Sequence, residues 1–246
     1  MNSLRAFSHL ALVTGLFLSG VAILAAEEPA QHFRFGAGPG GQSVRMVAAD
    51  DLYSKQRGCG FEPGLKVINV PGGVSGGPAF YFTTDLAEGN WRVKVTLQGA
   101  HGGGLVAVKA ELRRLMVGPV RLGESEKLER TFFVNVRSPL IAARPGVPLG
   151  RVKLKEPRES VMEAWAWDGA LTLEIDGEGA VLEAVDISPV EVPTIFLLGD
   201  STVCDQPAEP YNSWGQMLPR FFKPDLAIAN HVIDADCQEI SASERL

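Results

Sequence analysis

The sequence predicts a mostly β protein, with an antiparallel β-sandwich over residues 27–190 followed by the opening of an α/β domain at residues 193–246. Two observations predict this class. Between Phe33 and Val190, apolar and polar residues alternate with a period of two in short segments separated by Gly and Pro turns. After Pro193 the alternation gives way to a continuous apolar run, which is typical of a strand in a parallel sheet.

Five segments of the first part are predicted strands. The clearest is NWRVKVTLQG, whose odd-numbered positions from Trp91 to Leu97 are apolar and whose even-numbered positions from Arg92 to Gln98 are polar. The others, which alternate or are rich in β-branched and aromatic residues, are residues 77–86, 104–115, 131–139 and 171–177. Joined by turns, they predict a sandwich of roughly 8 to 10 strands. In the last of them, the alternation predicts that Thr172 and Glu174 face solvent.

The second part has the order strand, helix, strand. PTIFLLGD, residues 193–200, contains four consecutive apolar residues that suit a strand buried on both faces. SWGQMLPRFF, residues 213–222, has apolar residues at helical spacing, and Pro219 must limit or bend that helix. DLAIAN, residues 225–230, is a short second strand, so an α/β domain begins here.

The first 26 residues have the composition of a secretory signal peptide. A basic start at Arg5 precedes an apolar stretch from Leu10 to Leu24, and small residues follow at Ala25 and Ala26. An uncleaved anchor is the alternative, but the stretch is shorter than the roughly 20 residues that span a bilayer. We expect a secreted or periplasmic protein with no membrane association after cleavage of the signal peptide.

Charge and cysteine content bear on which ligands and partners the protein is expected to have. The net charge is −6, and the three arginines within residues 112–121 lie among apolar residues, so no nucleic-acid surface is expected. The odd number of cysteines leaves at least one thiol free; they are Cys59, Cys204 and Cys237. No group of residues has metal-ligand spacing, and we expect neither a metal nor a cofactor. The acids Asp50, Asp51 and Asp85 are of the type that binds calcium. The default interpretation is that they are solvated acids in loops.

Two longer segments carry a family resemblance. FLLGDSTVCDQ, residues 196–206, and YNSWGQMLPRFFKPDLAIANH, residues 211–231, resemble the start of the GDSL (SGNH) hydrolases. The closest likeness is to rhamnogalacturonan acetylesterase-like proteins, whose first block reads Gly-Asp-Ser-Thr. Upstream, GNWRVKVTL and LTLEIDG resemble the galactose-binding-like β-sandwich of the same proteins. The resemblance implies a galactose-binding-like jelly roll followed by a three-layer α/β SGNH hydrolase domain.

The resemblance also implies a chemistry. Ser201 would be the nucleophile, and its own N–H would be one oxyanion donor. Gly199 would permit a sharp turn, and Asp200 would be structural. The activity implied is a carbohydrate esterase that deacetylates a pectin-like polysaccharide through a serine acyl-enzyme, without a cofactor. Its partner would be a polysaccharide or an acetylated sugar ester.

The sequence departs from the family pattern after His231. The family takes its base from an Asp-x-x-His block and further oxyanion donors from a later Gly and Asn, and VIDADCQEISASERL supplies none of these. Asn230 and His231 do not occupy the family's functional positions. We expect residues 232–246 to be out-of-frame or otherwise aberrant sequence, and the chain to be a truncated esterase with negligible turnover.

The alternative function is a non-catalytic carbohydrate-binding module. Trp165 and Trp167, predicted to share one strand face, would form a platform for sugar stacking, although packing in the core is the stronger expectation for both. Whether the chain is an enzyme therefore stays open at the level of sequence.

Overall fold

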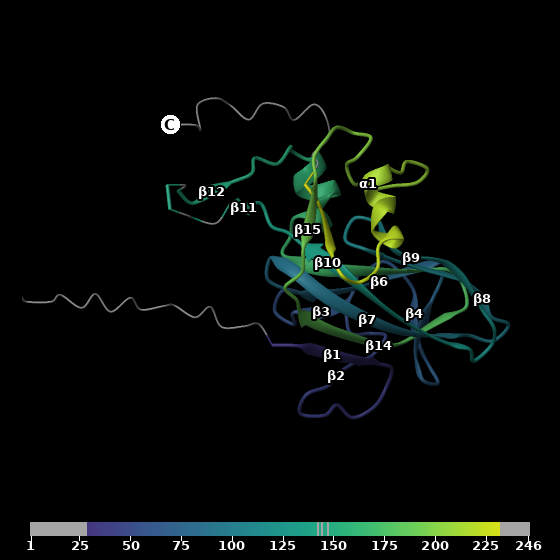
Figure 1. Ribbon diagram of the computed structural model, residues 1–246. Coiled ribbons are helices and arrows are strands. Elements are labelled where there is room, and N and C mark those ends of the chain that lie inside the picture. Colours follow the sequence, from purple (N-terminus) through teal and green to yellow (C-terminus); the bar gives the residue numbers. More distant parts are fainter. Residues whose placement is uncertain (1–28, 142, 144, 147, 232–246) are drawn as a thin grey trace, which may run out of the picture.

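The structure is a computed structural model, and it describes residues 29–141, 143, 145–146 and 148–231. The predicted signal peptide, Cys237 and the predicted aberrant tail lie outside the described residues. The fold is mostly β, as predicted, with two packed sheets and a short C-terminal α/β segment on one side of them (Figure 1).

The first sheet has the strand order β10-β7-β14-β1-β2, and β5 and β4 extend from β14. Its pairs are antiparallel except for the parallel pair of β1 and β2. Its strands are β1 (Gln31–Phe35), β2 (Arg45–Val47), β4 (Val67–Val70), β5 (Gly73–Gly76), β7 (Gly89–Gly99), β10 (Lys127–Val136) and β14 (Ala180–Pro189). Strands β4 and β5 form an antiparallel hairpin in a Gly-rich stretch, with Val70 paired to Gly73.

The second sheet is antiparallel, with the order β3-β6-β13-β8-β9. Its strands are β3 (Cys59–Phe61), β6 (Ala79–Asp85), β8 (Gly104–Ala110), β9 (Arg114–Leu122) and β13 (Ala170–Asp176). A small pair and two short helical turns connect β10 to β13; they are β11 (Leu140–Ile141), β12 (Gly150–Arg151), η1 (Arg158–Met162) and η2 (Ala164–Ala166).

The core lies between the two sheets, and the alternating pattern determines its composition. Trp91, Val93, Val95 and Leu97 are all buried, which confirms the inward face predicted for this strand. The ring of Phe82 on β6 lies 4.9 Å from that of Phe35 on β1. Edge-to-face aromatic pairs of this kind join the two sheets.

One predicted strand proved to be two. The sequence predicted a single strand over residues 104–115, but β8 ends at Ala110 and β9 begins at Arg114. Between them, Glu111 and Arg113 have φ values of 54° and 60°, in the left-handed region that breaks a strand. This tight turn directs two successive arginines toward the C-terminal segment.

The C-terminal segment opens as strand, helix, strand, as predicted. Strand β15 (Thr194–Leu197) pairs in parallel with β16 (Ala227–Asn230), and α1 (Trp214–Met217) and η3 (Leu218–Phe221) lie between them in the chain. Its small core consists of Leu197, Val203, Cys204 and Ile228, with Leu218 and Leu226 packed against them.

This segment covers one side of the sandwich. Strand β16 packs against β10, and α1 and η3 pack against β9 (Figure 1). Strands β9 and β10 are edge strands of the two sheets, so the segment lies along the edge that they share. Burial of β15 on both faces was predicted, and this was wrong for the described residues: Ile195 is 38% and Phe196 62% exposed.

Candidate functional site

Ser201 lies in an exposed turn just beyond the carboxyl end of β15. The carbonyl of Asp200 accepts from the N–H groups of Val203, at 2.9 Å, and Cys204, at 3.2 Å, which closes the turn. Gly199 is needed here because a Cβ atom would lie 2.6 Å from Cγ2 of Val203. The turn therefore depends on close packing of Gly199 against the segment core.

Asp200 has a structural role in this turn. Its carboxylate accepts from the Thr202 hydroxyl at 2.7 Å and from the Thr202 N–H at 2.9 Å. These hydrogen bonds lower the pKa of Asp200. The carboxylate is thus bound to Thr202, which fits the structural part that the resemblance implied for it.

The hydroxyl and the backbone N–H of Ser201 are the two hydrogen-bond donors of this residue. Within the described part of the chain, neither its hydroxyl nor its backbone N–H makes a hydrogen bond to another residue. Its carbonyl accepts from Gln206 Nε2 at 3.3 Å, which holds the backbone in place. The hydroxyl is exposed to solvent, and no side chain of the described residues hydrogen-bonds to it as a base would.

A groove of about 810 Å³ opens beside Ser201, and we name it the Ser201 groove. Residues from both parts of the chain line it; among them are Pro157, Arg158 and Met162 from the sandwich and Ser201, Gln206 and Tyr211 from the C-terminal segment. Tyr211 is 70% exposed, so its ring is free to contact a ligand. The structure thus makes the groove a composite of two segments that the sequence treated as separate domains.

No histidine contacts Ser201 within the described residues. The ring of His231 packs against Phe196 at a centroid distance of 5.5 Å. Burial lowers the pKa of His231 to about 4, and the nearby charges of Arg137 and Arg114 act in the same direction. His32 and His101 pair with Asp186 and Glu124 elsewhere on the sandwich.

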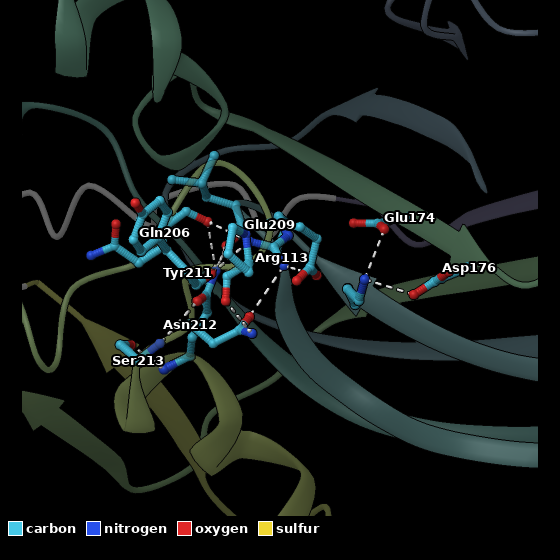
Figure 2. Close-up of polar contacts among 12 residues, drawn as sticks. Arg113, Glu174, Asp176, Gln206, Glu209, Tyr211, Asn212 and Ser213 are labelled. Carbon is cyan, nitrogen blue, oxygen red and sulfur yellow. Dashed lines mark hydrogen bonds and ion pairs between the residues drawn. The ribbon is translucent and has the colours of Figure 1, made fainter. Parts of the chain in front are cut away.

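Arg113 connects the sandwich to the wall of the Ser201 groove. Figure 2 shows its side chain among Gln206, Glu209, Tyr211 and Asn212. The guanidinium donates to the carbonyls of Gln206, at 3.2 Å, and Tyr211, at 3.1 Å, and to Oδ1 of Asn212, also at 3.1 Å. It also donates to the carboxylate of Glu209. One side chain of the sandwich thus holds four points of the loop that ends at α1.

Arg114 reaches the same loop from the next position. Its Nε donates to Oδ2 of Asp205 at 2.7 Å, and the other carboxylate oxygen accepts from Asn230 Nδ2 at 2.7 Å. Asn230 also donates to the carbonyl of Val203 at 2.8 Å. All three side chains are buried, so Asn230 is a structural residue that ties β16 to the Ser201 turn.

The helix of the segment is fixed by its own motif. Ser213 and Gln216 form a capping box, and Nε2 of Gln216 donates to the carbonyls of Leu112, at 2.8 Å, and Gln206, at 2.9 Å. Gly215 is required because a Cβ atom would lie 2.3 Å from the carbonyl oxygen of Val203. Ser213, Gly215 and Gln216 are therefore explained by their contacts with the Ser201 loop and the β8–β9 turn.

Sequence reasoning missed Arg113, Arg114 and Asp205. The signal was present, because two arginines within the apolar LRRLM segment must be paired if the segment is buried. The partners could not be found, since Asp205 lies 91 residues further along the chain.

A second groove, of about 480 Å³, crosses the outer face of the first sheet, and we name it the first-sheet groove. Three ion pairs line it, namely Arg34–Asp186, Lys94–Glu129 and Lys127–Glu183. The N···O distances are 2.9, 3.0 and 2.8 Å respectively. Burial raises the pKa of Asp186, but hydrogen bonds from His32 and Arg34 outweigh it and leave that pKa lowered.

A β-bulge shapes this groove. The pairing of β14 with β7 shifts between Leu182 and Ala184, which leaves Glu183 without a partner in the register. A bulge redirects the side chain of its extra residue, and here the side chain of Glu183 lines the groove.

The other candidates have structural roles. Trp165 lies within a 3-10 turn and Trp167 directly follows it, so the predicted shared strand face was wrong. Trp167 is buried and lies 4.2 Å from the guanidinium of Arg137, while Trp165 packs 4.9 Å from Tyr81. Packing explains both rings without a sugar platform.

Two of the three acids considered for calcium, Asp51 and Asp85, are already paired with other groups. Asp51 pairs with Arg57, and Asp85 accepts from Tyr53 and Lys55. Among the residues that the structure describes, no three His, Cys, Asp or Glu side chains gather as metal ligands. No helix in the described part of the chain is long and apolar enough to span a membrane.

Comparisons with known proteins add similarities of fold. No protein-family model and no curated protein matches the chain. The solved structure of Bacillus subtilis YXIM is 24% identical over 84% of this chain and 55% of that one, with a TM-score of 0.44. The plant receptor-like kinase FER is 12% identical over 66% of this chain and 42% of its own, with a TM-score of 0.35.

A third similar structure is smaller. The carbohydrate-binding module CBM6cm-2 of Cellvibrio mixtus lichenase 5A, in complex with cellotriose, is 14% identical. The similarity covers 59% of this chain and 96% of that module, with a TM-score of 0.27. This chain spans about half the length of the first two structures. The fold itself defines a mostly β protein built on a β-sandwich, with one groove on the sandwich and a second beside Ser201.

Proposed function

We propose that the protein binds carbohydrate through the first-sheet groove of its β-sandwich. The observation that carries this proposal is the set of three ion pairs that line the groove. A sugar hydroxyl both donates and accepts hydrogen bonds, so it can bridge a carboxylate and an ammonium or guanidinium group. A groove lined by several acidic and basic groups offers such a pair of partners to more than one sugar hydroxyl.

The shape of the surface supports a chain-like ligand. A smaller hollow, lined by His32, Arg92 and Ser188 among others, shares Lys94 and Asp186 with the first-sheet groove. The polar surface therefore continues across neighbouring strands, which suits successive sugar units of a polysaccharide.

Isothermal titration with soluble oligosaccharides of several backbone types tests the proposal. We expect a binding oligosaccharide to lose about tenfold or more in affinity when Lys94 and Asp186 are both replaced by Ala. Lys223→Ala, at an exposed position of the C-terminal segment, is the matched control and should bind as the parent does. Equal affinity of the double variant and the parent would place binding elsewhere.

We infer a second candidate function, a serine carbohydrate esterase, from Ser201. The free hydroxyl and N–H at the end of β15, beside the Ser201 groove, suit a nucleophile that attacks an acetyl ester. The described residues supply no base that contacts Ser201, so we predict negligible turnover from this chain. Incubation with an acetylated oligosaccharide tests both statements. Acetate release at the background rate agrees with the predicted negligible turnover. Release above background that Ser201→Ala abolishes supports the esterase, and equal release above background from both chains opposes it.

A further inference from the structure

The loop that carries Ser201 is held by residues of another part of the chain. Residues 200–212 form the turn and one wall of the Ser201 groove. Arg113 donates to three residues within 206–212 by hydrogen bonds of 3.1 to 3.2 Å, and Arg114 pairs with Asp205 at 2.7 Å. Arg113 ends the turn between β8 and β9 of the sandwich, and Arg114 is the first residue of β9.

We infer that Arg113 and Arg114 are positioning residues for the Ser201 groove, which makes the β-sandwich a structural part of that site. The inference rests on the second candidate function in so far as Ser201 is its reactive group. Neither arginine lies among the residues that line the groove. They act through the loop that they hold.

The guanidinium group suits this task. Its several N–H donors lie in one plane and point in fixed directions, so Arg113 can hold two carbonyls and one side-chain amide at once. An ammonium group keeps the charge but has three donors on a flexible stem, and it cannot reproduce that geometry. Lys at this position should therefore hold the loop only in part.

The backbone of the turn supports the same conclusion. Glu111 and Arg113 adopt left-handed conformations that side chains rarely occupy. Such a conformation persists where surrounding contacts hold it. Here these are the hydrogen bond from the Glu111 N–H to the carbonyl of Thr172, at 2.7 Å, and the contacts of Arg113 and Arg114 with the loop. The carbonyl of Leu112, in the same turn, also accepts a hydrogen bond from Nε2 of Gln216.

Two buried thiols allow a direct test. Cys204 lies in the Ser201 loop, and Cys59 lies in the core of the sandwich. In a Cys237→Ser background, the labelling rate of Cys204 by a thiol reagent reports opening of the loop, and that of Cys59 reports opening of the sandwich. Mass mapping of the labelled peptides separates the two.

We expect Arg113→Ala to raise the labelling rate of Cys204 about tenfold or more while that of Cys59 stays within about twofold of the parent. Arg113→Lys should give an intermediate rate. Arg121→Ala, at an exposed position of β9, is the matched control and should leave both rates unchanged.

If Arg113→Ala unfolds the protein and exposes both thiols, Arg113→Lys becomes the test of the inference. In that variant the labelling rate of Cys204 must rise while that of Cys59 does not. Unchanged labelling of Cys204 in both variants, or parallel rises of both thiols in both variants, would overturn the inference. The readout needs neither sugar nor ester, so a failure of either proposed function does not alter it.

Discussion

Arg114 and Asp205 form a buried ion pair between the sandwich and the C-terminal segment, with side chains 0% and 2% exposed and a 2.7 Å contact. Asp205 also lies 3.6 Å from the buried guanidinium of Arg137, so removing Arg114 leaves the carboxylate with one more distant cation. We therefore expect Arg114→Ala to lower the free energy of unfolding by about 1–3 kcal/mol in urea denaturation.

Asp205→Leu is the comparison for this cluster, because it leaves both Arg114 and Arg137 without their buried carboxylate. Its loss of stability should be larger than that of Arg114→Ala. A cost below about 1 kcal/mol for Arg114→Ala would contradict the burial of the pair.

Gly215 is expected to tolerate no side chain. A Cβ atom would lie 2.3 Å from the carbonyl oxygen of Val203 and 2.9 Å from its Cγ1. Gly215→Ala should cost about 1–3 kcal/mol of unfolding free energy through overpacking. Gly77→Ala is the matched control, because a Cβ atom there has no neighbour within 4 Å among the described residues. Thermal unfolding of both variants measures the difference, and equal midpoints would refute it.

Asp168 should make the protein less stable as the pH rises from about 4 to 6. Burial raises its pKa from 3.8 to about 6, so in this range the folded state keeps a proton that the unfolded state has lost. The free energy of unfolding should fall by on the order of 2 kcal/mol across this window and level off above it. Urea denaturation at several pH values measures the slope, and Asp168→Asn should remove it. A slope that Asp168→Asn leaves intact would assign it to another group.

His231 should remain neutral down to about pH 4, since burial near Arg137 and Arg114 lowers its pKa to about that value. NMR titration of the imidazole resonances measures this directly. His101 is the internal comparison: its hydrogen bond with Glu124 raises its pKa above 6.5, so the two rings should titrate in well-separated ranges. Titration of His231 near 6.5 would show that its ring is exposed to water.

Much of the fold could be predicted from local pattern. The apolar residues from Trp91 to Leu97 and the Gly-Asp-Ser block after β15 lie where the alternation and the apolar run place them. The same pattern failed for Thr172 and Glu174, which it assigns to solvent and which are buried. Thr172 bonds Thr83 at 2.9 Å, and Glu174 pairs with Lys109 at 2.9 Å. Alternation reports the two faces of a strand but not whether other parts of the chain cover the second face.

The sequence by itself determined the class of fold, the strands of the sandwich and the place of Ser201 at a strand end, because these follow from the local order of residues. Only the tertiary structure decided that the two predicted domains share a buried polar seam at Arg113, Arg114 and Asp205, and that a bulge points Glu183 into a groove. Such contacts join residues far apart in the chain. Their partners are chosen by the packing of edge strands and by the need to pair every buried charge, and no local pattern records that choice.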